Sequence, residues 1–246
     1  MKSTCTATRL CAAALVVFVA GCAAEGDMAG SPSSFLIVGA TVVDGTGAPG
    51  RVMNVRVLGD RIVALGGPEA ERGETVVEAD GLVLAPGFID THSHHDGDLI
   101  ETPEALGAVS QGITTIIVGQ DGGSPLPLSD FFGEVEATSV AINVAAYAGH
   151  NSLRNAVMGD DFRRPADDQE VQDMADLLRR ELEAGAIGLS TGLEYDPGIY
   201  SETSEVLALA HVTADAGGRY ISHMRSEDRA FFAALDELLT IGRETG

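Results

Sequence analysis

After residue 86, short apolar runs typical of strands alternate with amphipathic segments typical of helices, and this alternation restricts the fold more than any other feature of the chain. The segment 167–185 is the clearest helix, because its apolar residues recur at helical spacing and a glycine follows as a stop signal. The strand-like runs are apolar at nearly every position, as expected for strands buried on both faces of a parallel sheet. The pattern predicts an α/β fold whose closed form is a (β/α)8 barrel of the TIM type. The runs are GFIDTH, ITTIIVG, VAINVAAYA, AIGLSTGL and RYISHM.

The region before this alternation has a different pattern. Residues 35–85 contain β-branched runs separated by turns with Gly and Asp, which predicts a small N-terminal β-sandwich layer. A linker with Gly, Ser and Pro is expected at residues 22–34. The barrel is expected to occupy residues 86–246, which contain only about the first five βα units, so the chain is predicted to be truncated after Gly246.

Residues 1–21 are predicted to be an export signal. Two basic residues precede an apolar core that is shorter than the about 20 residues a membrane-spanning helix needs. The sequence VAGC, which ends at Cys22, resembles the lipobox of bacterial lipoproteins, in which the cysteine is lipidated. An ordinary signal peptide with an incidental Cys22 is the alternative. The prediction is an exported lipoprotein, anchored to the membrane of the bacterial cell envelope.

The charge balance limits the partners of the chain. Acidic residues outnumber basic residues 37 to 15, and the formal net charge is −22. Such a charge opposes binding to nucleic acid or to an anionic membrane surface, so membrane contact is expected through the lipid anchor only. All three cysteines lie within the first 22 residues, which leaves no disulfide in the mature fold. A small molecule is therefore the expected partner.

The first predicted strand of the barrel runs into three of the six histidines of the chain. His92 and His94 are two residues apart, so on an extended strand both imidazoles project to one side and can converge on a metal ion, while Ser93 points away. Active sites of such barrels lie at the carboxyl ends of the strands, where these histidines are found. A His-x-His pair alone is a weak signal, and His95 is expected to be a neighbour and not a ligand.

Several motifs resemble the amidohydrolase superfamily of metal-dependent hydrolases. The segment APGFIDTHSHHD, residues 85–96, resembles the signature of its first strand. Later motifs narrow the resemblance to the D-aminoacylase branch, the N-acyl-D-amino-acid deacylases, from about Phe35 to the last residue. These motifs are SQGITTIIVGQDGGSP, GHNSLR, GAIGLSTGLEYDPGIYS and GGRYISHMRSE. The resemblance implies that His92 and His94 bind one or two divalent metal ions, usually Zn²⁺.

The resemblance also implies roles for residues further along the chain. His223, at the end of the fifth predicted strand, corresponds to the third metal-binding histidine. Tyr195 and Arg225 correspond to substrate-side groups, with a packing or salt-bridge role left open for both. His150 is expected to line the pocket.

The chain departs from its relatives at the anionic ligand that bridges two metal ions. The resemblance implies either a carboxylated lysine on the fourth strand or, in D-aminoacylases, a cysteine after the second strand. The mature chain has no lysine, and Asp121 stands at the position of the cysteine. Glu194 is the expected bridge, because it ends the strand that carries the lysine in relatives. Asp121 is the alternative, or part of an ordinary Asp-Gly turn.

The implied reaction is hydrolysis of the amide bond of an N-acyl-D-amino acid by a metal-activated water. The resemblance places the general base, an aspartate, and a fourth histidine on later strands, so this segment alone is predicted to be inactive. Two alternatives stay open. One is another amidohydrolase, such as an isoaspartyl dipeptidase-like or cyclic-amide hydrolase. The other is a non-catalytic, lipid-anchored binding protein.

Overall fold

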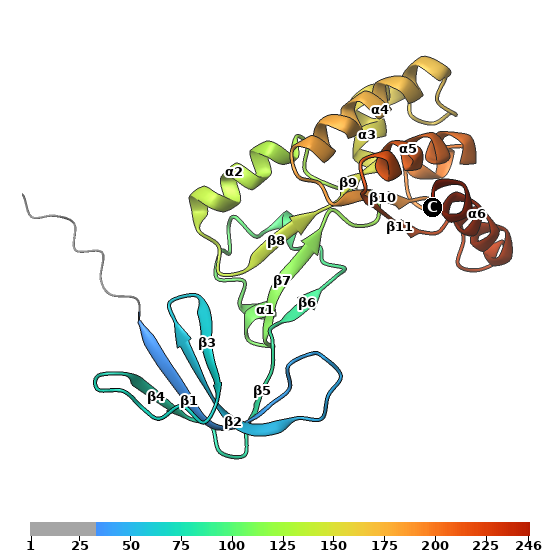
Figure 1. Ribbon diagram of the computed structural model, residues 1–246. Helices are drawn as coiled ribbons and strands as arrows, with labels where there is room; N and C mark the ends of the chain where they lie inside the picture. Colours follow the sequence, from blue (N-terminus) through green and yellow to red (C-terminus); the bar gives the residue numbers. More distant parts are fainter. Residues whose placement is uncertain (1–32) are drawn as a thin grey trace, which may run out of the picture. The chain divides into compact units, whose positions relative to one another are not determined.

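The computed structural model describes residues 33–246, so the predicted export signal and Cys22 lie outside the described residues. The chain divides into two compact units between Ala85 and Pro86 (Figure 1). In the described residues, the first unit is built from strands alone, and the second alternates strands with helices. Within residues 33–246, no helix is long and apolar enough to cross a bilayer.

The first unit is a five-stranded sheet with the order β3-β2-β1-β4, in which β5 also pairs with β1. Its strands are β1 (Ser34–Val42), β2 (Arg51–Leu58), β3 (Arg61–Gly66), β4 (Thr75–Glu78) and β5 (Val83–Leu84). β1 pairs antiparallel with β2 and parallel with β4 and β5. Leu36, Ala40 and Val55 are buried in this sheet, as the β-branched and apolar pattern of these strands predicts.

An ion pair joins β2 to the segment that leads into β4. The guanidinium of Arg56 donates from Nε to Oε1 of Glu74 over 2.7 Å, and Ser34 donates its hydroxyl to the same oxygen over 2.6 Å. These hydrogen bonds, that from Arg56 above all, lower the pKa of Glu74 from its usual 4.5 to about 2. The carboxylate therefore contributes to the stability of the sheet only while it is ionised.

The second unit contains parallel strands in two groups, β6-β7-β8 and β9-β10-β11. They are β6 (Phe88–Asp90), β7 (Ile113–Val118), β8 (Asn143–Ala146), β9 (Ala148–Gly149), β10 (Gly188–Gly192) and β11 (Arg219–His223). Within each group, strands that follow each other along the chain also lie beside each other in space (Figure 1). Only Tyr147 separates β8, the last strand of the first group, from β9, the first strand of the second. Their carboxyl ends consequently meet at one edge, where parallel α/β folds place their chemistry.

Helices connect these strands and bury their apolar faces. They are η1 (His95–Gly97), α1 (Leu106–Val109), α2 (Leu128–Thr138), α3 (His150–Met158), η2 (Gly159–Asp161), α4 (Asp168–Glu183), η3 (Gly198–Tyr200), α5 (Thr203–Asp215) and α6 (Phe231–Thr245). α3, α4 and α5 pack against β9–β11. The core between helices and strands includes the fully buried Ile116, Leu153, Leu178 and Leu189.

The helix α4 shows how local sequence sets these elements. Asp167 accepts a hydrogen bond from the backbone N–H of Glu170, and the Glu170 side chain accepts one from the backbone N–H of Asp167, which together form a capping box. Met174 and Leu178 are buried on the inner face, where each stabilises the fold by about 1.5–3 kcal/mol. The helix ends before Gly185, whose φ of +113° allows the chain to turn away.

Candidate metal centre

His92 and His94 lie just beyond a strand and not on it. β6 ends at Asp90, two residues earlier than the position of His92. The backbone beyond β6 still pairs with β7, because the backbone N–H of Ser93 donates to the carbonyl of Ile117 over 3.0 Å. Ser93 is therefore buried, while the rings of His92 and His94 lie 5.3 Å apart on the other side. Ser93 thus diverges from the two histidines as expected, and both histidines lie just past the carboxyl end of β6.

His95 points away from this pair. Its Nδ1 lies 2.7 Å from the hydroxyl oxygen of Ser93, and the short helix η1 begins at this residue. The imidazole is thus occupied by a local hydrogen bond within the turn that follows β6.

Asp121 brings a carboxylate to the histidine pair. Its Oδ2 lies 3.4 Å from Nε2 of His92 and 3.2 Å from Nε2 of His94. The ligand atoms of these three residues all lie within 4.8 Å of one another. One carboxylate oxygen and two imidazole nitrogens therefore converge on a single point at the carboxyl ends of β6 and β7.

The backbone of the turn after β7 aims this carboxylate. Asp121 has a φ of +53°, and its neighbours Gly119 and Gly122 have φ values of +73° and +78°. Asp tolerates this left-handed conformation better than most residues, and glycine adopts it without cost. A Cβ on Gly119 would lie 2.2 Å from the carbonyl oxygen of Tyr147, so the neighbouring strand leaves no room for a side chain there.

Glu194, His223 and Tyr195 form a second group at the ends of β10 and β11. Gly192 is the strand partner of His223, so the two strands end level. Nε2 of His223 lies 3.2 Å from Oε2 of Glu194, and its Nδ1 lies 3.2 Å from the hydroxyl of Tyr195. Desolvation, together with the nearby carboxylates of Asp121 and Glu194, raises the pKa of the Tyr195 hydroxyl. Glu194 therefore stands beside His223, whereas Asp121 stands beside the first two histidines.

Glu227 is a further carboxylate of this group, and the sequence analysis did not single it out. Its Oε1 lies 3.7 Å from Nε2 of His223. The signal that could have found it is its position four residues after His223, on the same connection from β11 to α6.

Arg225 takes part in an internal ion pair. Its Nε and Nη2 each donate to a carboxylate oxygen of Glu237 on α6 over 2.9 Å, and its Nη1 donates to the carbonyl of Ile199 over 3.3 Å. Of the two roles that the sequence left open, the structure shows the salt bridge. This two-pronged contact attaches α6 to the loop that follows β11.

His150 lies in the interior, so the expectation that it lines a pocket was wrong. It is fully buried, and its Nε2 lies 2.8 Å from Oε1 of Glu205 on α5. Arg154, one turn further along α3, is also fully buried and donates from Nη1 to Oε1 of Glu205 over 2.6 Å. Burial acts to raise the pKa of Glu205, but His150 and Arg154 outweigh it and lower this pKa. The His150–Arg154–Glu205 cluster therefore joins α3 to α5.

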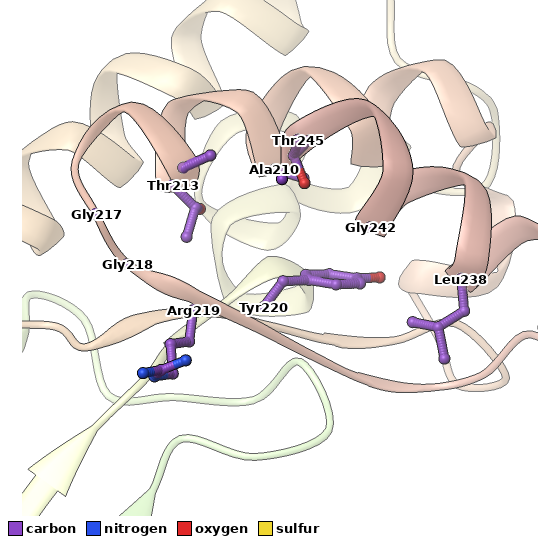
Figure 2. A pocket seen from close by; sticks show the side chains of 11 residues that line it. Ala210, Thr213, Gly217, Gly218, Arg219, Tyr220, Leu238, Gly242 and Thr245 are labelled. Carbon is purple, nitrogen blue, oxygen red and sulfur yellow. The ribbon is translucent and has the colours of Figure 1, made fainter.

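A cavity of about 580 Å³ lies between α5, the start of β11 and α6. Figure 2 shows Arg219 and Tyr220 at the start of β11, below the helices that carry Ala210 and Thr245. His223 stands at the opposite end of the same strand. This cavity is therefore separate from the groups that could bind a metal.

Comparison with known proteins decides the family. Residues 75–241, more than half of the chain, match the model of the Amidohydrolase family. The chain belongs to this family. The chain is 37% identical to a D-aminoacylase from Alcaligenes xylosoxydans xylosoxydans over 236 residues, which cover 87% of this chain and 49% of the relative. It is 41% identical to an N-acyl-D-aspartate deacylase from the same organism over 242 residues, which cover 89% of this chain and 48% of the relative.

A solved structure gives the same result for the fold. The chain superimposes on the N-acyl-D-glutamate deacylase from Bordetella bronchiseptica, in complex with zinc and a phosphonate mimic of the tetrahedral intermediate, with a TM-score of 0.83. The two are 38% identical, and the match covers 88% of this chain and 50% of the other. The predicted family and its amidohydrolase-type α/β fold are confirmed. The chain spans about half the length of the curated relatives it matches.

The donor atoms of His92, His94 and Asp121 fit a divalent cation. Zn²⁺ takes imidazole nitrogens at about 2.0–2.1 Å and carboxylate oxygens at about 2.0–2.2 Å, usually in a tetrahedral arrangement. Side-chain atoms within 4.8 Å of one another can all reach such a cation with small rotations of His92, His94 and Asp121. Three protein ligands leave a coordination position open for water or substrate, as in catalytic zinc sites.

Proposed function

We propose that the full-length protein is a metal-dependent hydrolase that cleaves the amide bond of N-acyl-D-amino acids. The observation that carries the proposal is the convergence of His92, His94 and Asp121 at the carboxyl ends of two parallel strands. Identities of 37% to a D-aminoacylase and 41% to an N-acyl-D-aspartate deacylase support this substrate class. In this proposal, β6–β11 form the first five strands of a (β/α)8 barrel, with β8 and β9 as one strand interrupted at Tyr147, and β1–β5 belong to a small N-terminal layer.

In the proposed site, His92, His94 and Asp121 would hold one Zn²⁺, and Glu194 and His223 would contribute ligands to a second. A bound divalent cation supplies Lewis acidity, which lowers the pKa of water and polarises an amide carbonyl. Asp121 supplies the negative charge that the two neutral imidazoles lack. This assignment moves the expected bridging role from Glu194 toward Asp121, because Asp121 is the carboxylate beside the histidine pair.

The remaining groups orient the substrate and hold protons. The hydroxyl of Tyr195 lies 3.2 Å from Nδ1 of His223, so the two side chains hold each other in place. The hydroxyl of Tyr195 is protonated near neutral pH, as the ordinary pKa of a tyrosine requires, and can donate a hydrogen bond to a substrate oxygen. Glu194, in turn, has its Oε2 3.2 Å from Nε2 of His223, so both atoms could reach the same cation.

The test is hydrolysis by the full-length protein of a panel of N-acetyl-D-amino acids, their L-forms, β-aspartyl dipeptides and hydantoins. Turnover of the D-forms that stops on chelation and returns with Zn²⁺ is the expected result. Preference for β-aspartyl dipeptides or hydantoins would assign the site to another amidohydrolase reaction. Saturable binding without turnover of any compound would identify a binding protein instead.

We also propose that Cys22 carries a lipid that anchors the protein to the membrane of the bacterial cell envelope. The support is the VAGC sequence that follows an apolar core too short to span a bilayer. Cys22→Ala should move the protein from the membrane fraction to the soluble fraction of the cell envelope. Ser33→Ala is the matched control, since it lies beyond the lipobox. Continued membrane association of Cys22→Ala would exclude the anchor.

A further inference from the structure

The hydroxyl of Ser190 spans the turn that carries Asp121. Ser190 lies on β10, is fully buried, and donates its hydroxyl hydrogen to the carbonyl of Gly119 over 2.5 Å. The same oxygen accepts a hydrogen bond from the backbone N–H of Gly122 over 3.2 Å. One side chain of β10 thus ties together the residues on both sides of Gln120 and Asp121.

This turn needs outside support. Its left-handed conformation at Asp121 persists only where surrounding contacts over-determine the backbone. On one side, the Gln120 side chain donates from Nε2 to the carbonyls of Thr91 and Ile117, each over 3.0 Å. Thr91 immediately precedes His92, so Gln120 ties the turn to the histidine segment. On the other side, Ser190 makes the hydrogen bonds with β10, and Gly192 of the same strand packs closely against the backbone of Asp121.

We infer that Ser190 is a positioning residue for the metal site, which holds the Asp121 carboxylate at its distance from His92 and His94. The inference rests on the proposed function, because it concerns a metal bound by these three residues. Ser190 touches neither the cation nor the substrate and acts through the backbone of residues 119–122. Groups that orient metal ligands in this way change metal affinity by about 10- to 100-fold when removed.

Thr191 provides a matched control. It is the next residue of β10 and is also fully buried, but its side chain points to the opposite neighbour. Its hydroxyl lies 2.9 Å from the hydroxyl of Tyr220 and donates to that of Ser222 over 2.8 Å, both on β11. Ser190→Ala and Thr191→Val each remove one buried, hydrogen-bonded hydroxyl from the same strand. A purely structural role would affect both variants alike.

The first measurement is titration of the metal-free full-length protein with Co²⁺, followed by its visible absorption bands. Ser190→Ala should bind Co²⁺ about 10- to 100-fold more weakly than the wild type, with altered band positions, while Thr191→Val binds like the wild type. If the loss of Co²⁺ affinity in Ser190→Ala exceeds that in Thr191→Val by less than fivefold, the inference is overturned. If Ser190→Ala does not fold, Ser190→Cys replaces it under the same criterion, since a thiol is a weak hydrogen-bond partner of similar size.

The second measurement needs no metal and separates this inference from the proposed function. Hydrogen exchange of the Gly122 amide, which donates to Ser190, should be faster in metal-free Ser190→Ala and unchanged in Thr191→Val. If the wild type binds no Co²⁺, the proposed metal site fails, and this exchange rate alone decides the role of Ser190. Equal exchange in both variants would remove Ser190 as the support of the turn.

Discussion

Replacing Asp121 with Asn tests which carboxylate serves the histidine pair. The change keeps the shape of the side chain, and Asn tolerates the left-handed backbone at this position as Asp does. It removes the negative charge 3.2 Å from Nε2 of His94 and 3.4 Å from Nε2 of His92. Glu194→Gln is the matched control, because it removes the same charge beside His223 instead.

The size of the effect follows from exposure and distance. The side chains of His92 and His94 are 49% and 61% exposed and that of Asp121 is 22% exposed, so water reaches the site. With a water-like dielectric constant of about 80, a carboxylate and a divalent cation about 2.1 Å apart attract by about 4 kcal/mol. The amide oxygen of Asn recovers part of this attraction, so the net loss of binding free energy for the cation is about 3 kcal/mol. That loss corresponds to a Kd for Zn²⁺ about 100-fold weaker.

The assay is competition with a chromophoric chelator for Zn²⁺, with metal content measured on the same samples of the full-length protein. Asp121→Asn should lose about 100-fold in Zn²⁺ affinity, and Glu194→Gln should lose less than tenfold at the tighter site. The opposite ranking would refute the reasoning and assign the principal carboxylate to Glu194 at the end of β10.

Three other perturbations test different parts of the molecule. His223→Ala should lower kcat/KM for an N-acetyl-D-amino acid by at least about 100-fold and reduce the bound metal, and unchanged rate and metal content would exclude a site at the end of β11. Arg154→Leu leaves the Glu205 carboxylate buried without its guanidinium, which should destabilise the protein by about 3–5 kcal/mol in urea unfolding followed by circular dichroism; a double change that also replaces Glu205 with Leu should recover much of the loss. The folded-state pKa of Glu74 is depressed to about 2, so its contribution to the free energy of unfolding is present above about pH 4.5 and lost as the pH falls toward 2. Glu74→Gln should therefore flatten the acid dependence of the free energy of unfolding in this window. An unchanged pH profile would contradict the role of Arg56.

The sequence predicted the parts of the fold that depend on local pattern. The strand-like runs correspond to β6–β11, and the segment 167–185 contains α4 with its capping residue and terminal glycine. Periodicity and turn residues act within a few positions of the chain, so they can be read without the tertiary structure. The end of β6 at Asp90 was not predicted, because it depends on how Ser93 bonds to β7.

The candidate site was predictable where the groups are two residues apart just after one strand, as for His92 and His94. The position of Asp121 was not, since a left-handed backbone aims its carboxylate and β10 supports the turn. The roles of Arg225 and His150 depend on carboxylates far along the chain, Glu237 and Glu205, that the sequence does not mark as their partners. Pairings of this kind appear only when the helices have packed.

The His150–Arg154–Glu205 cluster also bears on the way the second unit folds. Two of its groups lie on α3 and the third on α5, and 51 residues separate Arg154 from Glu205. A partly folded state in which one of these helices has docked without the other cannot close an apolar interior over the remaining charged groups, because a buried unpaired charge is costly. The interior around this cluster should therefore close only when both helices dock. α3 and α5, with α4 and β10 between them in the chain, should form and melt as one cooperative block, although the ion cluster itself adds little to the net free energy of folding.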